Sequence, residues 1–510
     1  MGELGWTAIA LLAALVAVIV WDLSQRRHSI LRTWPVLGHF RFIFEAVGPE
    51  LRQYIVTNND AERPFSRDQR RWIYATSKGQ DNRFAFGTDN DLDRATNHLI
   101  VRPAAFPPPG LEPTAGERAP VAKVLGGARG RRKAFRPQSI VNVSGMSWGA
   151  LSGPAIESLN RGAAEAGALH CTGEGGISNH HRHGGDLIFQ IASGYFGCRD
   201  SRGRFDLAKL VDLCEANPVK ALEIKLSQGA KPGVGGLLPA GKVTSEIARV
   251  RGVPAGVDCA SPPYHSAFSD EDSLLDFVER LADATGLPVG IKSAVGDAAF
   301  WTRLASLMKP GDRGVDFIVI DGGEGGTGAA PLVFTDHVAM PFMGGFAEVS
   351  RVFGRAGIHD RVVFVGSGRL GLPQRAIEAM ALGCDWINVG REAMLSVGCI
   401  QAQRCHTGNC PSGVATQSKW LMRGVDTADK SQRAGRYLKG LRDEMVGVAR
   451  AAGAAHPAEL STDSVMLLDG KQPAQRVADV YGIDPTWSTP SSEDLEALYS
   501  DWPARRPAAA

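Results

Sequence analysis

The chain has 510 residues, of which 44% are apolar and 22% are charged, and its formal net charge is +2 at pH 7. This composition is ordinary for a globular protein and excludes wholesale disorder, while a net charge so close to zero gives no indication of a nucleic-acid partner. We therefore expect one large domain with extensions, and no nucleic acid among its partners.

The chain opens with a run of 17 uncharged residues at positions 5–21, with a tryptophan near each end. Its length is close to that of the shortest helix that crosses a hydrocarbon core about 30 Å thick. We predict a single-pass transmembrane anchor over residues 1–25; the alternative, a cleaved signal peptide, would need positive charge before the run. Because arginines gather after the run instead, the positive-inside rule places the following domain in the cytoplasm.

Residues 26–114 are rich in arginine, aromatic residues and proline, and we predict a basic, helical N-terminal extension there. The segment 32–48, RTWPVLGHFRFIFEAVG, has the composition of an amphipathic segment that lies at a membrane surface. A helical linker that packs on the main domain is the alternative.

From about residue 138 the sequence changes to short apolar runs rich in β-branched residues, each followed by a glycine-rich loop and a helical pattern. This alternation indicates parallel strands joined by crossover helices. Eight such strands close an α/β barrel of the (β/α)8 TIM type, which carries its functional groups at the carboxyl ends of the strands. The predicted strands are residues 139–145, 168–173, 221–227, 255–261, 287–293, 315–323, 361–368 and 384–390. The polar, helical sequence that follows predicts a C-terminal helical extension over residues 426–510.

Glycine-rich loops follow the seventh and eighth predicted strands, GSGRLG at residues 366–371 and GREA at residues 390–393. GSGRLG matches the dinucleotide-binding fingerprint, but that fold also needs an acidic residue at the end of the next strand, where this chain has Gly390 and Arg391. In a barrel, the same two loops commonly bind a phosphate group. The phosphate of flavin mononucleotide (FMN) fits this position, and its predicted ligands are Gly366, Ser367, Gly368, Arg369, Gly390 and Arg391.

Two further stretches suit the flavin ring. Lys292 ends the fifth predicted strand, where its charge would stabilise a negatively charged reduced ring; a structural, salt-bridged lysine is the alternative. The loop after the first strand, SGMSWGALS, offers small side chains and backbone to one edge of a flat ring. There we predict contacts from Ser144, Met146 and Ser147.

Polar residues in the loops after the second and third predicted strands suit an anionic substrate. Glu174, in CTGEGG, would orient an amine or imine or transfer a proton; the alternative is a carboxylate that caps the loop backbone. Lys225, Gln228 and Lys231 share the loop KLSQGAKPGVGGLLP, as a site for a dicarboxylate requires.

Cys399, Cys405 and Cys410 lie within 12 residues just past the eighth predicted strand, in a chain that has 8 cysteines. A cytoplasmic location argues against disulfides. Zinc with His406 as a fourth ligand is one alternative, although an adjacent cysteine and histidine rarely both reach one tetrahedral ion. Three thiolates in a glycine-bearing loop favour an iron–sulfur cluster with three protein ligands.

Four motifs together resemble the flavin-binding synthase domain of glutamate synthases over about residues 115–425: EIKLSQGAKPGVGGLLP, DGGEGGTGAAP, GCIQAQRCHTGNCPSGVATQ and CTGEGG. The run PVLGHFRFIFE after the predicted anchor resembles the membrane-anchored, stand-alone members of the FMN-binding glutamate synthase family, which lack the glutaminase domain. The resemblance implies a barrel that binds FMN and a [3Fe-4S] cluster, with Cys399, Cys405 and Cys410 as the cluster ligands.

The resemblance also implies a reaction. An oxidoreductase of the class acting on CH–NH2 donors would reduce an imine of 2-oxoglutarate and an amine donor to glutamate or an N-substituted glutamate. A ferredoxin or a separate reductase subunit would supply the electrons. The residues implied as catalytic are Glu174, Lys292 and Gln228, and those implied as substrate-binding are Lys225, Gln228 and Lys231.

The chain departs from the commoner family members at Val234, where they have an acidic residue, and at Cys171, where they have asparagine. Two other functions stay open. An FMN-dependent 2-hydroxy acid oxidoreductase would need a histidine base beside the flavin, for which His337 is the nearby candidate. A non-catalytic electron-transfer subunit of a membrane complex would bind the flavin without turnover.

Overall fold

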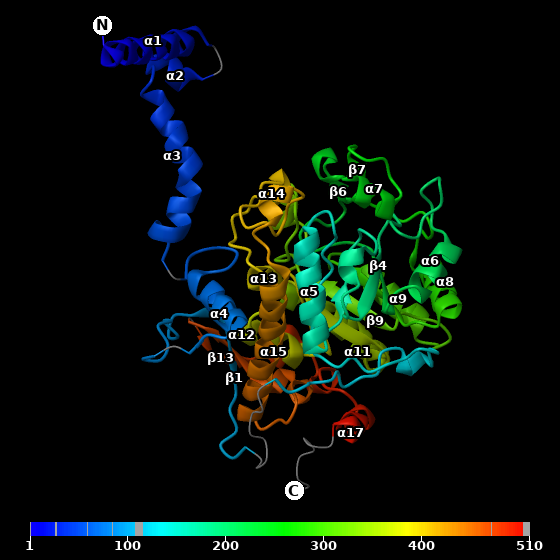
Figure 1. Ribbon diagram of the computed structural model, residues 1–510. Coiled ribbons are helices and arrows are strands. Elements are labelled where there is room, and N and C mark those ends of the chain that lie inside the picture. The colour runs from blue at the N-terminus through cyan, green and yellow to red at the C-terminus, as the bar shows by residue number, and fades with distance from the viewer. Residues whose placement is uncertain are drawn as a thin grey trace. The chain divides into compact units, whose positions relative to one another are not determined.

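The computed structural model describes residues 2–25, 28–58, 60–83, 85–107, 116–470 and 472–502 (Figure 1). The chain divides into two compact units, Met1–Arg71 and Trp72–Ala510. The first unit is helical, with α1 at Glu3–Ser24, α2 at Ser29–Thr33, α3 at Gly38–Leu51 and a π-helical turn at Arg52–Val56. Helix α4, Arg67–Lys78, follows.

Helix α1 contains an apolar stretch of 20 residues, Gly5–Ser24, which is long and apolar enough to cross a membrane. Its large side chains lie on the surface, and Leu11 and Trp21, for example, are 68% and 69% exposed. A signal sequence or a buried core helix meets the same criteria of length and composition. The structure therefore confirms the predicted apolar helix near the N-terminus.

The second unit is built on a closed barrel of eight parallel strands, which confirms the predicted (β/α)8 TIM barrel. Strand pairing closes the barrel between β11 and β2. The strands are almost entirely buried, as expected when helices cover a parallel sheet. In order around the barrel they are β2 (Val141–Val143), β3 (His170–Cys171), β4 (Leu187–Ile191), β5 (Val219–Lys225), β8 (Val289–Ser293), β9 (Phe317–Asp321), β10 (Val363–Ser367) and β11 (Trp386–Val389).

One predicted barrel strand, residues 255–261, is wrong. Only Cys259–Ala260 of it is extended, as β7, and it pairs antiparallel with β6 (Leu237–Leu238) in a separate two-stranded sheet. The actual third strand is β4, which the sequence analysis missed because a short 3-10 turn, Asn179–His181, stands before it in place of a crossover helix. Lys225 therefore ends the fourth barrel strand, while Lys292 still lies on the fifth.

Helices cover the outside of the barrel in the expected alternation. Ser152 caps the first of them by accepting a hydrogen bond from the Ala155 N–H, and Gly167 ends it in the left-handed conformation, with φ of 65°. The barrel helices are α5 (Gly153–Ala166), α6 (Leu207–Glu215), α8 (Glu271–Thr285), α9 (Ala298–Met308), α11 (Phe342–Ala356), α12 (Pro373–Leu382) and α13 (Arg391–Ser396). Shorter helices lie in the loops: α7 (Ser245–Arg251), α10 (Leu332–His337), α14 (Lys419–Met422) and 3-10 turns at Ala240–Lys242 and Cys405–Thr407.

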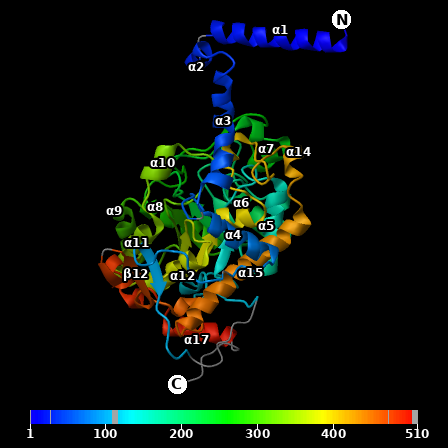
Figure 2. The same ribbon diagram turned by 90° about the vertical axis from the view of Figure 1, so that its left-hand side faces the viewer.

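The C-terminal region begins with the 25-residue helix α15, Thr427–Ala451, which packs along α5 (Figure 1, Figure 2). The two helices approach closely at Gly162, where an added Cβ would lie 2.5 Å from the Ala434 Cβ. Beyond α15, a three-stranded antiparallel sheet runs in the order β1 (Thr96–Val101), β12 (Val465–Asp469) and β13 (Gln472–Arg476). Helices α16 (Val477–Tyr481) and α17 (Ser492–Asp501) complete the region.

Candidate active site

The carboxyl ends of three neighbouring strands form a buried ion pair. Lys292 near the end of β8 places its Nζ 3.5 Å from Oδ1 of Asp321, the last residue of β9, and the two side chains are 7% and 6% exposed. The Ser367 hydroxyl, at the end of β10, donates to the same oxygen at 2.6 Å. The Gly229 N–H donates to Oδ2 at 2.7 Å. The carboxylate thus accepts hydrogen bonds on both oxygens as well as facing a lysine.

Opposing effects act on both ionisable groups of this pair. Burial lowers the pKa of Lys292, but Asp321 and Glu223 outweigh it and hold the pKa above its usual value. Burial likewise raises the pKa of Asp321, but Lys292 and the Ser367 and Gly229 hydrogen bonds outweigh it and hold the pKa below its usual value. Both groups are therefore charged at neutral pH. Lys292 is therefore salt-bridged, as the structural alternative predicted, and the salt bridge lies at the barrel mouth.

A second buried cluster lies deeper in the barrel, and the sequence analysis missed it. Glu223 stands two residues before Lys225 on β5, so both side chains share one face of the strand. Gln190 Nε2 donates to Glu223 Oε1 at 2.5 Å, and the Cys171 Sγ lies 3.7 Å from the same oxygen. Burial raises the pKa of Glu223, with Lys292 acting against it. The signal was a glutamate between apolar residues in the middle of the strand, in ALEI at residues 221–224.

Three of the predicted substrate and catalytic residues meet in one hydrogen-bonded group. Lys225 Nζ lies 3.1 Å from Glu174 Oε2 and donates to Gln228 Oε1, also at 3.1 Å. Gln228 Nε2 in turn donates to the Gly326 carbonyl at 2.8 Å. Lys225 lowers the pKa of Glu174 more than burial raises it, so Glu174 is ionised at neutral pH. The structure thus places a fixed carboxylate and a cation side by side after β3 and β5.

Lys231 and the glycines around it complete this part of the site. Lys231 donates to the Gly235 carbonyl at 3.3 Å, and its charge also lowers the pKa of Glu174. Burial lowers the pKa of Lys231, with Glu174 acting against it. An added Cβ at Gly236 would lie 2.6 Å from Glu174 Oε1, so the loop passes close to the carboxylate here.

The predicted flavin-ring residues lie beside this group. An added Cβ at Gly173 would be 2.6 Å from the Ser147 N and 2.9 Å from the Met146 carbonyl carbon. The loop of Met146 and Ser147 therefore packs directly on the loop that carries Glu174. The backbone N–H of Ser144 donates to the Val389 carbonyl at the end of β11, which joins the first and last barrel strands at the mouth.

The predicted phosphate residues lie at the end of β10, in the loop after it and just after β11, which adjoins the first strand. An added Cβ at Gly390 would stand 3.7 Å from the Ser144 Cβ and would meet nothing closer. Gly368 and Arg369 both have positive φ, of 131° and 60°. The half-buried Arg391 guanidinium donates to the Glu324 carbonyl, and burial lowers its pKa. The Ser367 hydroxyl is engaged by Asp321, so only its backbone could serve a phosphate.

The three cysteines of the predicted cluster are free thiols in the loop after α13. Cys399 Sγ accepts from the Gln401 N–H at 3.4 Å. Burial raises the pKa of Cys410, but hydrogen bonds from the Ser412 side chain and from backbone N–H groups outweigh it and hold the pKa below its usual value. Burial raises the pKa of Cys405. Within the described residues, no three histidine, cysteine or acidic side chains are placed to hold a single metal ion.

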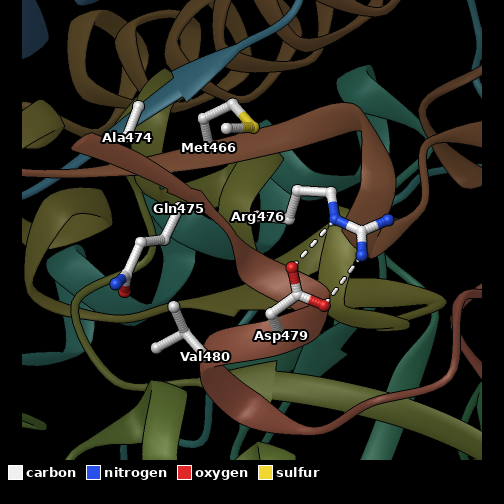
Figure 3. A pocket seen from close by; sticks show the side chains of 6 residues that line it. All are labelled: Met466, Ala474, Gln475, Arg476, Asp479 and Val480. Carbon is white, nitrogen blue, oxygen red and sulfur yellow. Dashed lines mark hydrogen bonds and ion pairs between the residues drawn. The ribbon is translucent and has the colours of Figure 1, made fainter.

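His337 and a groove in the C-terminal region are two further features of this unit. His337, the candidate base of the 2-hydroxy acid alternative, is exposed at the end of α10. A groove of about 400 Å³ is formed by β12, β13 and α16, where Arg476 makes a two-point ion pair with Asp479 (Figure 3). None of the predicted site residues line this groove, whose walls are Met466, Ala474, Gln475, Arg476, Asp479 and Val480.

Comparisons with known proteins give the family to which this chain is similar. A family model described as "Conserved region in glutamate synthase" matches residues 122–455. The glutamate synthase large subunit-like protein YerD of Bacillus subtilis is 34% identical over 90% of this chain and 94% of its own length. The archaeal glutamate synthase [NADPH] of Methanocaldococcus jannaschii is 36% identical over 61% of this chain, which spans 59% of that relative. A mutant mandelate oxidase with an FMN adduct matches 73% of this chain and 90% of its own at 18% identity and a TM-score of 0.42, too distant a likeness to bear on chemistry.

Proposed function

The chain belongs to the glutamate synthase family, and on this premise we propose that it is a flavin- and iron–sulfur-dependent oxidoreductase that reduces an imine of 2-oxoglutarate to glutamate or an N-substituted glutamate. The observation that carries the proposal is the hydrogen-bonded group of Glu174, Lys225 and Gln228 at the barrel mouth, beside the ion pair of Lys292 and Asp321. It combines a fixed carboxylate for a cationic nitrogen with cations for an anionic substrate.

The residues at the mouth fit FMN. Gly390 and Gly368 expose backbone without a side chain just after β11 and β10. Arg391 supplies a half-buried cation beside them, and its Cδ packs against Gly326. The proposed ligands are Ser144, Met146, Ser147, Lys292, Gly366, Ser367, Gly368, Arg369, Gly390 and Arg391. FMN, when bound, supplies hydride to the substrate. The charged Lys292 is suited to stabilise negative charge on a reduced ring.

The proposed substrate residues bind different parts of the substrate according to their charge. Lys225 and Lys231 attract the two carboxylates of 2-oxoglutarate. Glu174, which is ionised, pairs with the positively charged imine nitrogen and accepts its N–H, while Gln228 holds Lys225 in position. Glu174, Gln228 and Lys292 are proposed as catalytic residues, and Lys225, Gln228 and Lys231 as substrate-binding residues.

The cysteine loop suits a cluster of several irons better than a single ion. In an iron–sulfur cluster each thiolate binds its own iron, so the three sulfurs do not have to meet at one point. Hydrogen bonds from backbone N–H groups to Cys399 and Cys410 stabilise thiolates, as such sites require. We propose Cys399, Cys405 and Cys410 as ligands of a [3Fe-4S] cluster that receives electrons from a ferredoxin or a separate reductase subunit.

The proposal extends to location and organisation. We propose that residues 1–25 anchor the chain in a membrane by a single pass, with the catalytic domain in the cytoplasm. The proposed divisions after the anchor are an N-terminal extension at 26–114, the synthase barrel at 115–425 and a C-terminal extension at 426–510.

The test follows the flavin spectrum of the detergent-solubilised protein under anaerobic conditions. After photoreduction we expect the flavin to reoxidise only when 2-oxoglutarate and an amine are both present, with ammonium and methylamine tried in turn. The Lys225→Met variant should need about tenfold more 2-oxoglutarate for the response, whereas Lys220→Met, which changes an exposed lysine on the same strand, should respond as the wild type does. A flavin that stays reduced with both substrates present would remove the glutamate proposal.

A further inference from the structure

One buried lysine lies against the cysteine loop and has no part in the catalytic proposal. Lys242, in the 3-10 turn Ala240–Lys242, is 7% exposed. Its Nζ donates to the Cys405 carbonyl at 2.7 Å. An added Cβ at Gly408 would lie 3.5 Å from the Lys242 Cε, so the aliphatic part of the side chain also faces the loop. The ammonium group is thus held inside the segment that joins Cys405 to Cys410.

Lys242 has no carboxylate partner in the part of the chain that the structure describes. Its Nζ is instead held against the cysteine loop by the Cys405 carbonyl, and Cys405 and Cys410 are the groups of opposite charge near it. A buried ammonium group without a counter-charge is costly, and in proteins such groups are paired or neutral. The two thiols are the groups placed to supply that charge.

We propose that Lys242 is the counter-ion of the iron–sulfur cluster and sets its reduction potential. The inference rests on the proposed cluster. Thiolate-bound clusters carry net negative charge, and their potentials depend on that charge, on hydrogen bonds to sulfur and on burial. A positive charge fixed beside two of the three ligands favours the reduced, more negative state. Burial strengthens the effect because water screens the charge less.

The experiment is a redox titration of the full-length, detergent-solubilised protein, with the cluster followed by electron paramagnetic resonance. The main variant is Lys242→Gln, because glutamine removes the charge and keeps an N–H donor for the Cys405 carbonyl. Lys242→Arg keeps the charge. Lys220→Gln is the matched control, since it removes one positive charge from an exposed position on β5.

We expect Lys242→Gln to lower the equilibrium constant for reduction of the cluster at least tenfold. This lowers the reduction potential by about 59 mV for a one-electron couple. Lys242→Arg and Lys220→Gln should stay within a few millivolts of the wild type. If Lys242→Gln lost its cluster while Lys242→Arg kept it, the charge would be required for assembly, as a counter-ion predicts. A cluster present in Lys242→Gln with an unshifted potential would overturn the inference and leave the cluster intact. A wild type that contains neither iron nor sulfide would instead overturn the proposed cluster.

Discussion

Replacing Asp321 by asparagine removes one charge of the buried ion pair and leaves Lys292 without its partner. Both partners are 6–7% exposed, so water screens the attraction between the two charges only a little. Removing one partner of a buried pair costs about 3–5 kcal/mol because the other charge is left uncompensated. Asparagine can still accept from the Ser367 hydroxyl, but its NH2 group then faces the Gly229 N–H, which loses its acceptor, so we expect Asp321→Asn to lower the free energy of unfolding by about 4 kcal/mol, the middle of that range.

The assay is urea unfolding at pH 7, followed by tryptophan fluorescence, with Lys292→Met and the double variant completing a mutant cycle. Trp301 and Trp386 are fully buried in the barrel unit and report its unfolding. Because Met and Asn together leave no unpaired charge, the double variant should lose about 2 kcal/mol less than the sum of the single variants. Single and double losses that add within about 0.5 kcal/mol would refute the coupling.

The pH dependence gives a second check on the same pair. In the wild type the pKa of Lys292 is raised, so its contribution is present below the unfolded pKa and is lost only as the pH rises through the folded value. In Asp321→Asn the largest charge that opposes burial is gone and Glu223 remains, so burial favours the neutral amine, the unfolded chain binds more protons and stability rises with pH. The deficit relative to the wild type should therefore shrink towards about pH 10. A deficit that is constant with pH would contradict this account.

Three further predictions concern the proposed chemistry. Glu174→Gln should slow 2-oxoglutarate-dependent flavin reoxidation by about 10²-fold or more with the flavin retained, as absorbance of the purified protein will show. Lys225→Met should raise the KM for 2-oxoglutarate by about tenfold or more, and it should move the acid limb of the kcat/KM profile to higher pH, because Lys225 is the main cause of the low pKa of Glu174. Cys410→Ser should abolish the iron–sulfur resonance signal and leave the FMN absorbance, whereas Cys384→Ser, a buried cysteine outside the loop, should keep both.

The sequence was informative where residues follow strands. Glu174, Lys225 and Gln228 are separated by up to 54 positions along the chain, yet they share one hydrogen-bonded group. That convergence was predictable, because parallel barrel strands bring their carboxyl ends to one face whatever the order of the loops. The miscounting of one strand did not disturb the prediction, since residues 255–261 and β4 lie on either side of Lys225 and the total of eight was preserved.

What lies inside the barrel was harder to read. Asp321, Glu223 and Gln190 each follow apolar residues within a strand, where a polar residue is equally compatible with an end of the strand or an edge of the sheet. Their partners come from other strands, and only the register pairs Gln190 with Glu223 and Asp321 with Ser367. Sequence spacing within one strand carries no information about that register.

Cys171 contacts the buried cluster of Glu223 and Gln190. Its Sγ lies 3.7 Å from Glu223 Oε1 and 3.8 Å from Gln190 Nε2, so it fills the space between a buried acid and an amide. Burial and Glu223 both raise the pKa of the thiol, which keeps it neutral. An asparagine at this position would present an amide to the same two groups, and a neutral thiol forms weaker hydrogen bonds than an amide. Cys171 therefore gives this cluster a weaker polar contact than an amide would give, and Glu223 Oε2 is unpartnered among the described residues.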